Sequence, residues 1–157
     1  MLTRKFRRIL RGVIVALLAV LVVVALVKIG KMEKTKELGV TSYTIGTISE
    51  TDGKDAKSTN ALRSDYQKAA KFNKIELAEN ADVTYQIFYY NADKKFIGKS
   101  AELTSETTEL SKTFTVDSAT ENVRYYRVVI KVPSDKDDVT LLNKGEYVKQ
   151  LTVTVNK

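Results

Sequence analysis

Cysteine and histidine are both absent from the 157-residue chain, and proline occurs once. Without cysteine no disulfide bond can stabilise the fold, which is compatible with an oxidising exterior but does not require one. Without histidine, zinc sites built from cysteine and histidine are excluded, as are Ser-His-Asp and Cys-His nucleophile systems. The single proline, Pro133, predicts the end of a strand and the start of an acidic loop.

Acidic residues are the remaining candidates for catalysis. Residues 37–157 contain 18 of them, but they are scattered, and no spacing selects a pair of the kind that glycoside hydrolysis requires. An enzyme would need such a pair in a cleft with perturbed pKa values. We therefore expect a protein that is not an enzyme and that uses no cofactor.

The excess of positive charge is confined to the N-terminal part of the chain. Residues 1–36 contain nine basic and one acidic residue, a net charge of +8, whereas residues 37–157 contain 17 basic and 18 acidic residues, a net charge of −1. A nucleic-acid-binding domain should have a basic surface of its own, so we expect no nucleic-acid partner. Attraction to a membrane surface is the better explanation for the basic N-terminus.

An unbroken apolar run occupies residues 13–27 and would span roughly 22 Å as a helix. Ile29 and residues before the run extend it toward the length of a bilayer core if Arg11 and Lys28 reach the headgroups. The run is too long for one strand, and a core helix would normally show a polar stripe. It predicts a transmembrane helix or a signal segment.

We favour an uncleaved anchor over a cleaved signal peptide. Val23 and Ala25 are tolerable before a signal-peptidase cut, but they lie inside the apolar run rather than in a polar region after it. Five basic residues precede the run and four follow it closely, and the denser N-terminal charges favour a cytoplasmic N-terminus. We therefore expect a single-pass protein of the cell membrane with its C-terminal domain outside the cytoplasm. The predicted parts are a basic cytoplasmic tip (1–12), a transmembrane anchor (13–29), a juxtamembrane linker (30–39) and an extracytoplasmic β-sandwich domain (40–157).

Short segments rich in Thr, Val, Tyr and Ile follow the linker and alternate with polar turns. This pattern is typical of an all-β, antiparallel β-sandwich. The expected strands are 40–49, 58–63, 74–78, 83–90, 95–99, 111–116, 124–132 and 147–155. Residues 91–95 predict a hairpin loop, residues 51–55 a turn, and residues 65–70 a possible helical turn.

Alternation within three of the strands predicts the hydrophobic core, because successive strand side chains point to opposite faces. The expected core faces carry Val83, Tyr85, Ile87 and Tyr89; Tyr126, Val128, Ile130 and Val132; and Leu151, Val153 and Val155.

A series of motifs runs in order through residues 45–131. It comprises Gly46-x-Ile48, Asp52-Gly53-Lys54, Leu62-Arg63-Ser64, Ile75-x-Leu77, Tyr85-x-Ile87-x-x-Tyr90, Asp93-Lys-Lys-Phe96-Ile97 and Tyr126-Arg127-Val128-Val129-Ile130. The series resembles the jelly-roll, carbohydrate-binding-like modules of Gram-positive surface proteins and phage structural proteins. The resemblance implies a jelly-roll-like sandwich in a bacterial protein, and it implies no catalytic set.

The best candidate binding site is the face opposite the predicted core on two strands. It carries Gln86, Phe88, Tyr90, Tyr125 and Arg127. Aromatic rings, a planar guanidinium and an amide suit the stacking and hydrogen bonding of a sugar ring or peptide. The alternative is that this face packs beneath a loop or a second sheet.

Asp135, Asp137 and Asp138, with Asp52 and Asp55 as further candidates, carry the oxygen ligands that Ca²⁺ prefers. They lack EF-hand spacing, and a solvated loop is the alternative. We thus expect a membrane-anchored binding module for a cell-surface glycan, a cell-wall polymer or a protein ligand. A non-catalytic structural or accessory subunit of a membrane or envelope assembly is the alternative.

Overall fold

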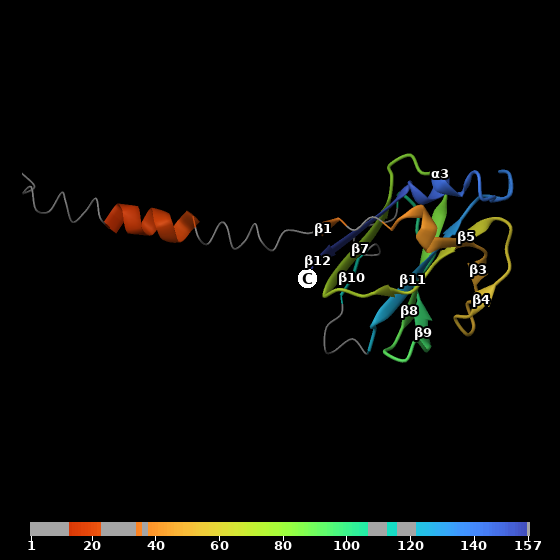
Figure 1. Cartoon of the computed structure of the whole chain (residues 1–157), viewed down its shortest axis with the longest axis horizontal. Helices are drawn as coiled ribbons and strands as arrows, with labels where there is room; N and C mark the ends of the chain where they lie inside the picture. Colours follow the sequence, from red (N-terminus) through yellow and green to blue (C-terminus); the bar gives the residue numbers. More distant parts are fainter. Residues whose placement is uncertain (1–12, 23–33, 36–37, 107–112, 116–121, 157) are drawn as a thin grey trace, which may run out of the picture. The chain divides into compact units, whose positions relative to one another are not determined.

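The computed structural model describes residues 13–22, 34–35, 38–106, 113–115 and 122–156 (Figure 1). The chain divides into two compact units, Met1–Met32 and Glu33–Lys157. The described part of the first unit is a helix over residues 13–22. Among the described residues, no helix has both the length and the apolar character needed to cross a membrane. Residues 1–12 of the predicted tip and 23–29 of the predicted anchor lie outside the described residues.

The second unit consists mostly of antiparallel β-sheets and has few helices, as the sequence predicts. Its strands are β1 (Lys34–Thr35), β2 (Tyr43–Ile45), β3 (Thr47–Ile48), β4 (Asp55–Ala56), β5 (Ala61–Ser64), β6 (Gln67–Lys68), β7 (Phe72–Leu77), β8 (Thr84–Tyr90), β9 (Phe96–Lys99), β10 (Thr113–Thr115), β11 (Tyr125–Lys131) and β12 (Leu151–Asn156). Its described helices are a 3₁₀ turn, η1 (Val40–Ser42), and one short α-helix, α3 (Lys144–Val148).

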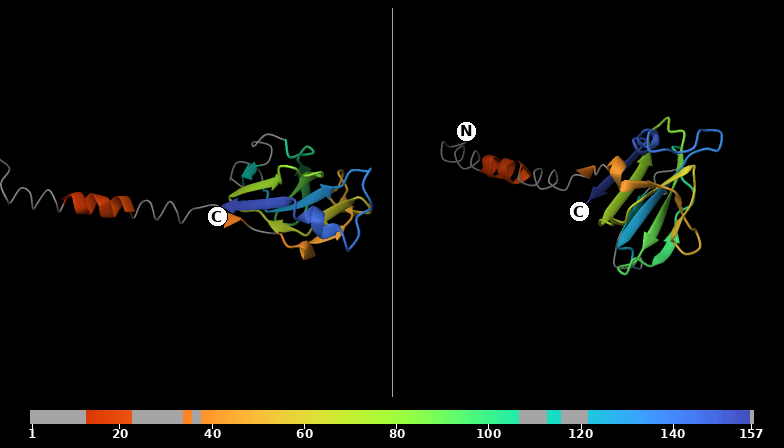
Figure 2. Two further views of the ribbon diagram at one scale, coloured as in Figure 1. Left: turned by 90° about the horizontal axis from the view of Figure 1, so that it is seen from above. Right: turned by 45° about the vertical axis from the view of Figure 1, so that its right-hand side comes forward.

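The strands form two large sheets and one small hairpin. One sheet has the order β1-β12-β7-β10, and the other has the order β2-β5-β11-β8-β9, with β6 also paired to β11. The β3–β4 hairpin pairs only with itself. Figures 1 and 2 show β7 and β12 on one side of β8 and β11, and Figure 1 shows the β3–β4 hairpin on the other side.

Both large sheets contribute buried side chains to the main core. It contains the alternating residues that the sequence predicts for β8 and β11, including Tyr85, Ile87, Val128 and Ile130. Val153 of β12 is buried there as well, and Leu151 and Val155 pack against it. The core-face prediction is therefore confirmed for these three strands.

A second apolar cluster, the outer cluster, lies on the opposite face of β8 and β11. Ile48, Ala61, Phe88, Tyr90 and Val129 are buried in it, and Phe96 and Tyr125 pack against it. Ile48 belongs to the β3–β4 hairpin, so this hairpin supplies part of the cover. The six-stranded sheet is thus buried on both faces along the centre of β8 and β11.

Three strand predictions are wrong in their extent. The segment 40–49 is not one strand: it begins as η1, and β2 and β3 are separated by Gly46, whose φ of 132° an L side chain rarely adopts. The segment 147–155 includes the end of α3 before β12 begins. The segment 58–63 forms a strand only from Ala61 onward. The expected helical turn near 65–70 contains β6 instead, and β6 is held by pairing with β11.

The other strand predictions agree closely with the structure where residues are described. The β8–β9 hairpin forms around residues 91–95, as expected. Its loop is fixed by the Asn91 side chain, whose Oδ1 accepts hydrogen bonds from the backbone N–H groups of Asp93 and Lys95. Strand 111–116 is described only over β10, and its remaining residues lie outside the described part of the chain.

Candidate functional site

The β3–β4 hairpin is held against the six-stranded sheet by two glycines that allow close approach. A Cβ on Gly53, whose φ is 70°, would lie 2.5 Å from the Phe96 Cβ. A Cβ on Gly46 would lie 1.8 Å from Arg63 Nη1 and 2.9 Å from the Ala56 carbonyl oxygen. Neither position can accept a side chain without movement of its neighbours. The hairpin therefore depends on glycine for its fit to the sheet.

Polar contacts fix the same hairpin to the sheet at its tip and at β4. The Tyr90 hydroxyl donates a 2.7 Å hydrogen bond to the Gly53 carbonyl oxygen. Glu50, in the hairpin turn, forms an ion pair of 2.9 Å with Lys99 on β9. The pKa of the Glu50 carboxyl is lowered by its hydrogen bond to Lys99. These contacts bring the turn 51–55 over the aromatic side chains of β8 and β9.

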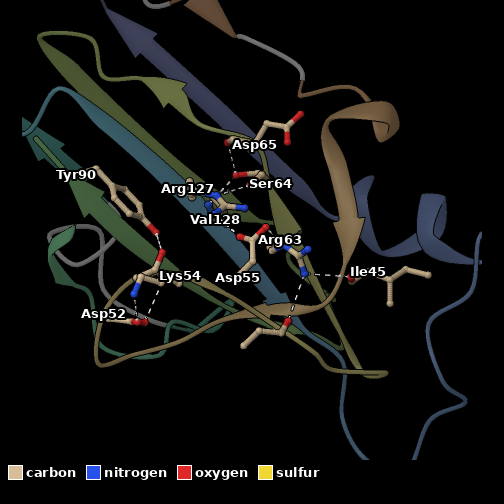
Figure 3. Close-up of polar contacts among 12 residues, drawn as sticks. Ile45, Asp52, Lys54, Asp55, Arg63, Ser64, Asp65, Tyr90, Arg127 and Val128 are labelled. Atoms are coloured by element: carbon tan, nitrogen blue, oxygen red, sulfur yellow. Dashed lines mark hydrogen bonds and ion pairs between the residues drawn. The ribbon is translucent and has the colours of Figure 1, made fainter. Parts of the chain in front are cut away.

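Asp55 on β4 is shared by two arginines from neighbouring strands (Figure 3). Its Oδ1 accepts a 2.7 Å hydrogen bond from Arg127 Nη1 on β11, and its Oδ2 lies 3.2 Å from Arg63 Nε on β5. Partial burial raises the pKa of the Asp55 carboxyl, but the contacts with Arg127 and Arg63 outweigh this and lower the pKa below its usual value. One carboxylate thus offsets two guanidinium groups.

Arg127 is the more buried of these arginines, with 6% of its surface exposed. Its Nε donates a 2.8 Å hydrogen bond to the Ser64 carbonyl oxygen, and the Ser64 hydroxyl accepts one from the Val128 backbone N–H. Its guanidinium carbon lies 4.9 Å from the centre of the Tyr66 ring. The side chain is therefore fixed by β5, β4 and the segment that follows β5.

A pocket of about 600 Å³ opens between the β3–β4 hairpin, the β8–β9 loop and the segment after β5. We call it the hairpin pocket. It is lined by Thr51, Asp52, Gly53, Lys54, Asp55, Asp65, Tyr66, Tyr90, Lys94, Lys95, Phe96 and Arg127. The lining combines aromatic rings with four basic and three acidic side chains, the composition of a polar binding site with apolar walls.

Tyr66 is the centre of an aromatic and cationic group at this pocket. Its ring packs edge-on against Tyr90, with ring centres 4.9 Å apart, and near Tyr125, with ring centres 6.4 Å apart. The Lys94 ammonium lies 4.9 Å from the Tyr66 ring centre and 5.6 Å from that of Tyr125. Lys94 is placed there by a left-handed backbone conformation, φ 57°, in the β8–β9 loop.

The structure brings together only part of the predicted site. The register opposes Tyr125 to Tyr90 and Arg127 to Phe88 across β11 and β8, so these residues share one face as expected. That face is not open. Phe88 and Tyr90 are each 1% exposed and Gln86 is 4% exposed, so the alternative of a covered face is the one observed.

Tyr90 and Arg127 nevertheless line the hairpin pocket, and Tyr125 contacts the Tyr66 group beside it. Phe88 belongs to the outer cluster and does not line the pocket. Gln86 is also absent from the lining. The binding role of the predicted residues stays a prediction, now restricted to these three.

Sequence reasoning missed Tyr66 and Lys94, because both depend on how loops from distant parts of the chain meet. Asp55 and Arg63 were missed as a pair for the same reason. The sequence did contain one signal for the pocket, the Asp-Gly pair at 52–53, which predicts a turn. It did not show that this turn lies over the aromatic face of β8 and β11.

The aspartates proposed for calcium are not gathered into a site. Within the described ranges, no group of three or more acidic residues is arranged to hold a metal ion. Lys136, between Asp135 and Asp137, instead forms a 3.0 Å ion pair with Asp82 from another loop, which lowers the Asp82 pKa. Asp52 pairs with Lys54 at 3.1 Å, and Asp55 is bound to arginine.

Comparison of the chain with protein-family models, curated proteins and solved structures finds no match. The functional argument therefore rests on the pocket itself.

Proposed function

We propose that this protein is a membrane-anchored, extracytoplasmic binding module whose β-domain holds a surface glycan, cell-wall polymer or protein ligand in the hairpin pocket. The module is non-catalytic in this proposal. The observation that carries it is the pocket of about 600 Å³ in which Tyr66 and Tyr90 stand beside Lys94 and Arg127. Ring surface supplies affinity, and a fixed guanidinium supplies orientation.

The pocket is built on rigid elements, which favours binding over a purely structural role. Arg127 and Tyr90 lie on paired central strands, and their side chains are held by Ser64, Asp55 and Gly53. Tyr66, by contrast, is 36% exposed, so part of its ring is available to a ligand. A preorganised floor with an accessible aromatic ring lowers the entropic cost of binding.

The proposal also includes the arrangement of the two sheets in the β-domain and the orientation of the chain in the membrane. We infer a jelly-roll-like β-sandwich from the motif series, and the shared core of the two sheets supports it. The apolar run of residues 13–27 and the basic tip before it support a single-pass anchor with an external domain. Protease added to intact cells expressing the full chain should then remove the domain. Protection of the domain from the protease would show that the domain lies on the cytoplasmic side of the membrane.

The binding proposal is tested by an array of surface glycans and cell-wall fragments probed with the full chain in non-ionic detergent. Tyr66→Ala should weaken binding by about 1–3 kcal/mol, the range for truncation of an aromatic contact residue. Tyr147→Ala is a control outside the pocket lining. Equal binding by wild type and Tyr66→Ala would remove the pocket from the proposal.

One observation favours the accessory-subunit alternative. Leu141 and Leu142 are 77% and 97% exposed in the turn before α3, although both are large and apolar. Adjacent exposed leucines are typical of a protein contact. If this alternative holds, Leu141→Ser with Leu142→Ser should abolish cross-linking to a membrane partner in cells, whereas Tyr66→Ala should not.

A further inference from the structure

We propose that the ligand of the hairpin pocket is an anionic polymer, one that carries carboxylate or phosphate groups along a hydroxyl-bearing backbone. The inference rests on the proposed function and adds the chemical class of the ligand. It is carried by the charge balance of the pocket and by the unused donors of a buried arginine.

The lining of the pocket has a positive charge that the rest of the domain lacks. Arg127, Lys54, Lys94 and Lys95 line the pocket and contribute four positive charges, and Arg63 lies outside the lining but shares Asp55 with Arg127. Three aspartates, at positions 52, 55 and 65, contribute three negative charges, so the balance of the lining is +1. Residues 37–157 as a whole have 17 basic and 18 acidic residues, so the positive charge is local.

Ion pairs within the protein do not remove this excess. Lys54 is neutralised by Asp52 at 3.1 Å. Asp55 is shared between Arg63 and Arg127, so a single carboxylate faces two cations. Among the described residues, neither Lys94 nor Lys95 forms an ion pair with an acidic side chain, and Lys94 instead lies near the rings of Tyr66 and Tyr125.

Arg127 has more hydrogen-bond capacity than its protein contacts use. Its Nε donates to Ser64, its Nη1 donates to Asp55, and the side chain also hydrogen-bonds the Tyr90 hydroxyl, while the guanidinium has five N–H donors in all. The residue is more than nine-tenths buried and yet lines the pocket. A carboxylate or phosphate oxygen of a ligand is the natural acceptor for donors fixed in this way.

The backbone of the polymer follows from the other lining groups. The Asp65 carboxylate lines the same pocket as Lys94 and Lys95. It would repel a uniformly anionic ligand such as an acidic peptide side-chain cluster, but it can accept hydrogen bonds from hydroxyl groups. The exposed part of Tyr66 provides an apolar surface for the C–H groups of such a backbone. Alternating anionic groups and hydroxyls match this arrangement.

The test measures binding of the full chain, in non-ionic detergent, to four immobilised probes at low and high salt. The probes are an oligogalacturonate, a polyglycerol phosphate, a neutral maltooligosaccharide and an oligoglutamate. We expect binding to the oligogalacturonate or the polyglycerol phosphate, with the preferred probe identifying carboxylate or phosphate as the source of the anion. Affinity should fall as salt is raised.

Matched variants assign the binding to the pocket. Lys94→Gln with Lys95→Gln should weaken binding of the preferred anionic probe by about tenfold, the effect of losing about 1.4 kcal/mol. Lys71→Gln with Lys149→Gln removes the same charge from exposed positions outside the pocket and should leave binding unchanged. An equal loss of binding affinity in both double variants would show that the net charge of the protein alone attracts the probe, and would overturn the inference.

The remaining outcomes separate this inference from the proposed function. Equal binding of the neutral maltooligosaccharide overturns the anionic class and leaves a pocket that binds glycans. Binding of the oligoglutamate alone overturns it in favour of an acidic peptide. No binding to any probe overturns it too, and the array with Tyr66→Ala then decides the proposed function independently.

Discussion

The main core and the outer cluster occupy opposite faces of the same two central strands, yet they are closed in different ways. The main core draws buried residues from both large sheets. The outer cluster is smaller, and Ile48 of the β3–β4 hairpin is part of its cover. That hairpin is held by Gly53, Tyr90 and the Asp55 ion pairs rather than by sheet pairing.

This difference suggests that the main core chiefly determines the stability of the domain, whereas the hairpin chiefly determines the shape of the pocket. Burial in the larger main core provides most of the hydrophobic stabilisation, which grows with the apolar area removed from water. The hairpin adds a smaller apolar area but forms one wall of the pocket. Substitutions in the main core should therefore unfold the domain, whereas substitutions that loosen the hairpin should alter the pocket and reduce stability only in part.

The largest effect is expected for Ile130→Asp. Ile130 is fully buried in the main core, and an unpaired carboxylate there would cost at least about 5 kcal/mol, comparable with the whole free energy of unfolding of a small domain, so we expect the variant not to fold. Circular dichroism should show loss of the β signal. Ile97→Asp is the control, because Ile97 is 45% exposed on β9 and should tolerate the charge. Retention of a cooperative unfolding transition in Ile130→Asp would contradict the assignment of the main core.

Gly53→Ala should have an intermediate effect, confined to the hairpin. The new methyl group would meet the Phe96 ring, and the backbone at φ 70° disfavours alanine, so we expect a loss of about 2 kcal/mol. Urea denaturation measures the loss. Gly98→Ala is a matched control, since a Cβ there meets nothing within 4 Å. If both substitutions have the same small effect, the hairpin does not fit closely on Phe96.

Tyr90→Phe should cost about 1 kcal/mol, because it removes the hydroxyl that donates to the Gly53 carbonyl and leaves the ring in place. Thermal denaturation of this variant is compared with that of Tyr125→Phe, whose ring packs at the edge of the outer cluster. A larger loss for Tyr125→Phe would show that the hydrogen bond to Gly53 does not anchor the hairpin.

The smallest effect concerns acid pH. The contacts of Asp55 with Arg127 and Arg63 lower its folded-state pKa, so the ionised form favours folding at pH values above the ordinary Asp pKa of about 3.9. This contribution is lost as the pH falls through the lowered folded-state pKa. Asp55→Asn should therefore flatten the acid side of a stability–pH curve measured by urea denaturation. An unchanged slope in the variant would show that other carboxyl groups govern acid unfolding.

The sequence predicts the sheet class and the faces of β8, β11 and β12 because alternation is a local property of each strand. It does not predict which face is open, since both faces of β8 and β11 carry apolar or aromatic residues, and Gln86 and Arg127 on the outer face do not settle which one is covered. Only the position of residues 47–56 decides that, and this position depends on contacts between residues such as Asp55 and Arg127, which are far apart in the sequence. The pocket residues Tyr66 and Lys94 escape prediction for the same reason.

The helix α3 shows a second limit of local patterns. The segment after the acidic loop contains Tyr147 and Val148, which suit a strand, and Val148 is buried in the main core. The structure forms a short helix there before β12 begins at Leu151. Packing of Val148 from a helical turn thus overrides the weak strand preference of the segment.

The place of β11 in the sheet also determines how the domain can assemble during synthesis. This strand pairs with β5, β6 and β8, yet it follows all three in the chain. Until Lys131 has emerged, β5 can pair with β2 and β8 can pair with β9, but the strand that joins these two pairs is missing. Non-local strand pairing of this kind makes folding slow. The edges of β5 and β8 that β11 will occupy stay unpaired until then, which makes the interval before β11 emerges the period of greatest exposure to aggregation and to chaperone binding.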